Sequence, residues 1–196
     1  KIGKRTIFNM IGPLSSPALV KKQVVGVFDQ KLLEIFANAL KNLNIDCAWI
    51  VNSEDGLDEI SPYAKTNVIQ LKNNIISKIS INPSEIGIKS EKFENILGKD
   101  SNFNSQKIIN IFKGEDNDFS IAVCLNTAAG LVVNGTNEKF NDAYQSSRAH
   151  ILSGKAFNHL KLLQNGWKYI KKNYRKKKIK NWWVKKKNFF RNPERK

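Results

Sequence analysis

Residues 22–52 read KQVVGVFDQKLLEIFANALKNLNIDCAWIVN and contain two apolar runs separated by an amphipathic segment. The two runs, residues 22–29 and 45–52, contain β-branched residues and are typical of buried strands of a parallel sheet. Between them, over residues 30–43, leucine and phenylalanine side chains recur at helical spacing. A strand, a helix and a second strand in this order form a βαβ unit, so we predict an α/β fold.

The rest of the chain is predicted to form a hairpin followed by helices. Residues 66–72 and 74–81 alternate moderately in polarity and indicate two strands joined at the turn-type pair Asn73-Asn74. Residues 83–100 mix proline, glycine and charged residues and are expected to be irregular. Helical patterns then cover residues 102–113, 118–133 and 137–163, the last with an interruption near Ser153-Gly154.

The positive charge of the chain is concentrated at its end. The 196 residues carry a net charge of +16, with 41% hydrophobic and 26% charged residues, as in a folded globular protein. Residues 167–196 hold 14 Lys and Arg against one acid, a net +13, whereas residues 1–166 have a net +3. We therefore predict an α/β body over 1–166 and a basic tail over 167–196 that is not part of that domain.

Several function classes are excluded by composition. The longest nearly apolar run, residues 121–133, is too short to span a bilayer, so no membrane association is expected. Cys47 and Cys124 lie far apart with no partner at metal-ligand spacing, which fits a reduced, cytoplasmic protein, and Cys124 is expected in the core. His150 and His159 have no nucleophile or acid at catalytic spacing and are expected to be solvated.

The densest acidic segment, Glu54-Asp55-Gly56-Leu57-Asp58-Glu59, directly follows the second predicted strand. Ligands of open α/β sheets bind at the carboxyl ends of strands. Magnesium is bound by one or two carboxylates together with waters and substrate phosphates, and Asp58 and Glu59 could supply such a pair. On composition alone, however, a solvated acidic turn without a ligand is favoured over a magnesium site.

Five segments follow one another at a family-specific order and spacing: KRTIFNMIGPLSSPA, QVVGVFDQKLLEIFANAL, EDGLDEIS, LNTAAGL and SGKAFNHL. The patterns R-T-x-F-N-x-x-G-P-L and D-G-x-D-E are the most specific of these. On these motifs the chain resembles the anthranilate phosphoribosyltransferase family from residue 1 to about residue 164. The match covers only about the second half of the family's chain.

The resemblance implies the large α/β domain of the type IV phosphoribosyltransferases, a fold shared with pyrimidine nucleoside phosphorylases. We expect a central, mostly parallel sheet flanked by helices, with the small helical domain largely missing. The implied reaction transfers the phosphoribosyl group of phosphoribosyl pyrophosphate to anthranilate in tryptophan biosynthesis, giving N-(5-phosphoribosyl)anthranilate and pyrophosphate. The resemblance also implies Mg²⁺ held by Asp58 and Glu59, and a cytoplasmic homodimer for the full-length enzyme.

The chain departs from the family in what it lacks. The glycine-rich Gly-Thr-Gly-Gly-Asp loop, the phosphate-binding residues and the anthranilate-binding residues have no counterpart here, and the resemblance places them upstream of Lys1. We therefore assign no catalytic or substrate-binding residue, and expect an inactive C-terminal part of the enzyme. For the tail, we weigh a lineage-specific extension against out-of-frame sequence and favour the latter, because amphipathic periodicity fades where the match stops.

A non-catalytic, nucleic-acid-binding relative of the same fold is the alternative function. Aromatic residues among the lysines of the tail could stack on bases, as in the pairs Tyr169 and Tyr174 or Trp182 and Trp183. The nearly neutral body and the intact D-G-x-D-E loop favour the enzyme instead. Nucleic acid is thus expected to bind only non-specifically, through the tail.

Overall fold

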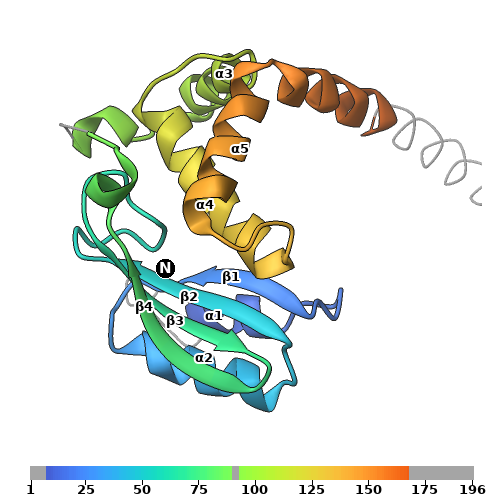
Figure 1. Ribbon diagram of the computed structural model, residues 1–196. Helices are drawn as coiled ribbons and strands as arrows, with labels where there is room; N and C mark the ends of the chain where they lie inside the picture. Colours follow the sequence, from blue (N-terminus) through green and yellow to red (C-terminus); the bar gives the residue numbers. More distant parts are fainter. Residues whose placement is uncertain (1–7, 90–92, 168–196) are drawn as a thin grey trace, which may run out of the picture.

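The computed structural model describes residues 8–89 and 93–167, which form one four-stranded sheet with helices on both faces (Figure 1). The strands, in their order across the sheet, are β1 (Lys22–Gly26), β2 (Cys47–Ser53), β3 (Thr66–Lys72) and β4 (Ile75–Ile81). The helices are α1 (Phe8–Ile11), α2 (Leu32–Asn42), α3 (Ser101–Phe112), α4 (Asp118–Asn134) and α5 (Phe140–Leu152), and residues 155–167 are again helical.

Two of the sequence predictions fall on residues outside this description. The predicted basic tail lies outside it apart from its first residue, Trp167. Lys1, upstream of which the resemblance places the substrate-binding residues, lies outside it as well. The separation of the tail from the α/β domain and the location of the substrate-binding residues therefore stay predictions from the sequence.

The predicted α/β class and βαβ unit are confirmed, since β1 and β2 are parallel and joined through α2. The expectation of a mostly parallel sheet is wrong for these four strands, because β2 pairs with β3 and β3 pairs with β4 in antiparallel fashion. A parallel pair needs a crossover of about a dozen residues or more, usually a helix. Residues 54–65 contain no helix, and the strand that follows them, β3, runs back beside β2 in the opposite direction.

The hairpin of β3 and β4 turns at the predicted pair, Asn73-Asn74. Both residues have positive φ angles, 50° and 65°. Two consecutive positive φ values match the right-handed twist of the flanking strands, and asparagine adopts this conformation more readily than most residues. The turn brings Lys72 directly opposite Ile75.

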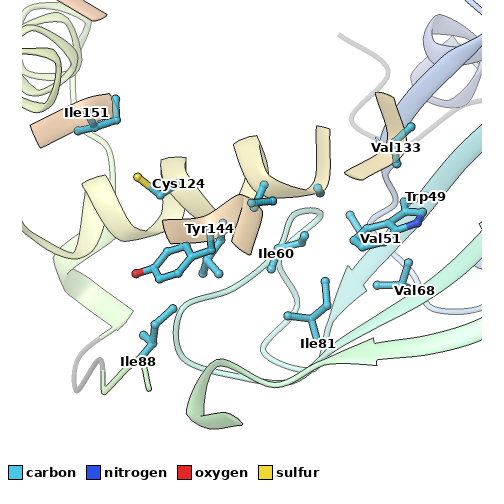
Figure 2. Packing of buried hydrophobic residues seen from close by; sticks show 14 of the residues in the cluster. Trp49, Val51, Ile60, Val68, Ile81, Ile88, Cys124, Val133, Tyr144 and Ile151 are labelled. Carbon is cyan, nitrogen blue, oxygen red and sulfur yellow. The ribbon is translucent and has the colours of Figure 1, made fainter. Parts of the chain in front are cut away.

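The core has two parts because β2 is buried along its whole length. Ala48 and Ile50 pack against α2 on one face, while Trp49 and Val51 pack against α4 and α5 on the other (Figures 1 and 2). The Trp49 ring also stacks on Phe140 at the start of α5, with ring centroids 6.0 Å apart. Alternate residues of one strand thereby hold both helical layers.

The helical half follows the predicted pattern. The α4 helix starts at a capping box formed by Asn117 and Ser120, and it is buried over much of its surface. Cys124 lies in the core as predicted, and burial raises the pKa of its thiol to about 11. His150 and His159 are exposed, also as predicted. Within the described part of the chain, no helix combines the length and apolarity needed to cross a membrane.

Candidate metal site

The acidic loop, residues 54–65, connects the carboxyl end of β2 to the start of β3. Ser53 and Thr66 face each other as the last residue pair of the two strands. The neck of the loop is closed twice: the Glu54 N–H donates to the Lys65 carbonyl at 2.9 Å, and the Lys65 Nζ lies 2.7 Å from the Glu54 carboxylate. The loop therefore leaves the sheet at the strand end where the sequence predicts a site.

Asp55 holds the interior of the loop. The Ser61 hydroxyl donates to one Asp55 carboxylate oxygen at 2.5 Å, and the Leu57 N–H donates to the other at 3.3 Å. Gly56 turns the chain between them with a φ of 92°. Asp55 thus uses both oxygens inside the loop, a structural role that the sequence does not separate from the rest of the acidic run.

The two predicted metal ligands, Asp58 and Glu59, are exposed on this loop. Within the described residues, neither carboxylate has a hydrogen bond or an ion pair, in contrast to Asp55. Partial burial of the Glu59 carboxyl group raises its pKa, and the negative charges of Asp58 and Asp55 raise it further. The loop is therefore locally electronegative and attracts cations.

The end of β1 lies directly against the loop. A β-carbon built on Gly26 would lie 1.6 Å from the main-chain oxygen of Asp58 and 2.7 Å from its carbonyl carbon. Only glycine permits this approach, so the last residue of β1 determines how closely the Asp58 main chain can pack. Gly26 was missed as a site residue, although a glycine inside a strand is a known sign of close backbone contact.

A second contact comes from α4. The Asn126 Oδ1 accepts from the Ile60 N–H at 2.9 Å, and its Nδ2 donates to the Ile60 carbonyl at 3.1 Å. The Ile60 side chain is fully buried and lies centrally in the cluster between the sheet and the helices (Figure 2). Glu59 is thus followed immediately by a residue fixed in the core. An asparagine in the middle of an apolar helix was the signal for this contact.

The donor set fits magnesium. Across residues 8–89 and 93–167, no group of three or more His, Cys, Asp or Glu side chains could hold a metal ion. A closed structural zinc site needs about four protein ligands. Magnesium instead keeps several waters and accepts one or two carboxylates together with phosphate oxygens. The exposed pair of Asp58 and Glu59 meets that requirement and leaves room for a phosphate-bearing ligand.

Fold and site together define an α/β protein with an exposed acidic loop at the carboxyl end of a strand. The family model described as "Glycosyl transferase family, a/b domain" matches residues 1–157, and the chain belongs to this glycosyl transferase family. Among individual relatives, the anthranilate phosphoribosyltransferase of Pelagibacter ubique (strain HTCC1062) is 68% identical over 165 residues. That match covers 84% of this chain and 50% of the relative.

Solved anthranilate phosphoribosyltransferases have the same fold. The enzyme from Thermus thermophilus matches with a TM-score of 0.73 and 28% identity, over 81% of this chain and 47% of that chain. The Saccharomyces cerevisiae enzyme in complex with PRPP and Mg matches with a TM-score of 0.72 at 23% identity, over 81% and 46%, and supports the fold alone. The family resemblance seen in the five sequence segments is confirmed. The chain spans about half the length of the relatives it matches.

Proposed function

We propose that this chain is the α/β part of an anthranilate phosphoribosyltransferase. The complete enzyme transfers the phosphoribosyl group of phosphoribosyl pyrophosphate to the amine of anthranilate and releases pyrophosphate. The observation that carries the proposal is the pair of exposed carboxylates, Asp58 and Glu59, which have no partner among the described residues and lie on a loop held at the carboxyl end of β2. The 68% identity to the Pelagibacter ubique relative supports the choice of substrates.

Asp58 and Glu59 are proposed to hold Mg²⁺, with the remaining ligand positions left to water and pyrophosphate oxygens. When bound, the ion supplies positive charge that stabilises the developing charge of the leaving pyrophosphate. Partial burial raises the pKa of Glu59, and the negative charges of Asp58 and Asp55 raise it further. The repulsion between these neighbouring carboxylates favours cation binding. Their exposure leaves the phosphate groups of a substrate free to approach.

The proposal also covers the oligomeric state, the cellular location and the domain organisation of the complete enzyme. For the complete enzyme we propose a homodimer in the cytoplasm, with its substrate-binding residues upstream of the position of Lys1, as the family resemblance implies. We further propose that residues 167–196 form a basic tail separate from the domain, since they carry a net +13 while residues 1–166 carry +3.

A chimera tests the function. In the Pelagibacter ubique enzyme, the segment that aligns with this chain is replaced by residues 1–165 of this chain, a substitution favoured by their 68% identity. With phosphoribosyl pyrophosphate and Mg²⁺ present, the chimera is expected to consume anthranilate, measured as loss of its fluorescence. The matched control is the same chimera with Asp58→Asn and Glu59→Gln, which should lose turnover. A folded chimera that is inactive beside an active parent enzyme would contradict the proposal.

A further inference from the structure

The side-chain amide of Asn126 makes hydrogen bonds to the Ile60 main chain of the kind that a neighbouring strand would make. Ile60 lies in the loop between β2 and β3, where its main-chain groups have no place in the sheet ladder, yet its side chain is fully buried. Asn126 binds both the Ile60 N–H and the Ile60 carbonyl, at 2.9 and 3.1 Å. The two buried polar groups of Ile60 are thereby satisfied by one side chain.

The orientation of this amide is fixed on its own helix. The Asn126 Nδ2 also donates to the Ala122 carbonyl, one turn earlier on α4, at 3.0 Å. The amide plane is therefore held at three points, two on the loop and one on the helix. A shift of the Ile60 main chain relative to α4 has to break at least one of these hydrogen bonds.

The residues between the two fixed points are the proposed metal ligands. The Asp58 main chain is packed against Gly26 at the end of β1, and the Ile60 main chain is bound by Asn126 on α4. Asp58 and Glu59 thus lie on a short span with a contact at each end. The adjacent carboxylates of Asp58 and Glu59 repel each other. Without the contacts to Gly26 and Asn126, the main chain could move and let the two carboxylates separate.

We propose that Asn126 is a positioning residue, which holds the carboxylates of Asp58 and Glu59 in the arrangement that binds a divalent cation. The inference rests on the proposed magnesium role of these two residues. Residues that orient metal ligands typically contribute about 10–100-fold to metal affinity. A residue that only stabilises the fold would leave the affinity of the folded chain unchanged.

Manganese provides the test, because it binds the ligands that magnesium binds and is paramagnetic. Mn²⁺ alone is titrated into the ¹⁵N-labelled 196-residue chain, and broadening of the Asp58 and Glu59 amide resonances is followed. In Asn126→Ala, half-maximal broadening is expected at about tenfold higher Mn²⁺ than in the unmodified chain. The matched control is Thr127→Ala on the same helix, since the Thr127 hydroxyl donates to the Val123 carbonyl at 2.7 Å and not to the loop.

Amide hydrogen exchange provides the second readout. Exchange of the Ile60 amide should accelerate in Asn126→Ala and not in Thr127→Ala. Should Asn126→Ala fail to fold, Asn126→Leu retains most of the side-chain volume and allows the same comparison. An unchanged Mn²⁺ midpoint in a folded Asn126 variant overturns the inference and leaves the metal site intact. No broadening in the unmodified chain overturns the metal role itself, and the inference with it.

Discussion

The main-chain oxygen of Asp58 lies so close to Gly26 that a β-carbon on Gly26 would be 1.6 Å away from it. Real β-carbons essentially never come within 3.0 Å of a heavy atom outside their own residue and its two chain neighbours. Any side chain at position 26 must therefore displace the main chain that carries the proposed metal ligand. The end of β1, an edge strand of the described sheet, and the position of the Asp58 main chain are coupled through this one contact.

Gly26→Ala is expected to lower turnover of the active chimera by about 10²-fold, because a displacement of about 1 Å at a reacting site can have that effect. Steady-state kinetics measure this change, with circular dichroism as the folding control. Gly130→Ala is the matched control. Gly130 lies on α4, and a β-carbon there would meet no atom within 4 Å. Equal turnover of the two variants would show that the loop adjusts freely to β1.

In the active chimera, Asp58→Asn and Glu59→Gln are each expected to lower turnover about 10²–10³-fold, the usual effect of losing a group that stabilises transition-state charge. Both side chains are exposed and have no partner among the described residues, so the circular dichroism spectrum should not change. Raising the Mg²⁺ concentration should restore part of the rate. Wild-type rates and wild-type magnesium dependence in both variants would show that this loop has no metal role.

Glu59→Gln should stabilise the metal-free chain at neutral pH. The pKa of Glu59 is raised in the folded state, so the folded chain binds this proton more tightly than the unfolded chain does. Stability is therefore lost as the pH rises above the ordinary glutamate value of 4.5. Glu59→Gln has no carboxyl group to ionise at this position, so the variant does not lose this stability as the pH rises.

Urea unfolding in EDTA measures this effect. The variant should have a higher free energy of unfolding than the unmodified chain at about pH 7, and an equal one near about pH 4, where Glu59 is largely protonated in both states. A variant that is less stable than the unmodified chain at neutral pH would mean that the Glu59 carboxylate has a stabilising partner.

Removing residues 167–196 should abolish binding to single-stranded DNA, because that segment carries a net charge of +13. Fluorescence anisotropy with a labelled oligonucleotide measures the affinity. Before truncation, the affinity should fall steeply as salt rises, as phosphate contacts do. The melting temperature should change little on truncation. A large decrease would indicate that the aromatic residues of the tail pack on the body.

The parts of the fold that depend on neighbouring residues could be predicted from the sequence. The βαβ unit over residues 22–52 follows from periodicity, and the turn at Asn73-Asn74 follows from the backbone preference of asparagine. The direction of β3 depends instead on the connection before it. Residues 54–65 form no crossover helix, and β3 therefore returns antiparallel to β2, contrary to the mostly parallel sheet that the family resemblance implied.

The candidate site could be predicted only in part. The carboxylates of Asp58 and Glu59 are visible in the sequence as an acidic run after a strand. The residues that hold them come from elsewhere: Gly26 from β1, more than 30 positions earlier, and Asn126 from a helix more than 60 positions later. Such contacts leave only weak local signs, a glycine at the end of a strand and an asparagine in the middle of an apolar helix.

The order in which the chain folds follows from these separations. A hairpin closed by two residues, like that of β3 and β4, forms within about 1–10 μs. The hydrogen bonds between Ile60 and Asn126 join positions 66 residues apart, so they form only after α4 has returned to the sheet. We therefore expect the acidic loop to take its final shape late, when most secondary structure already exists. A nearly folded intermediate would then have its sheet and helices in place and still be unable to capture a cation.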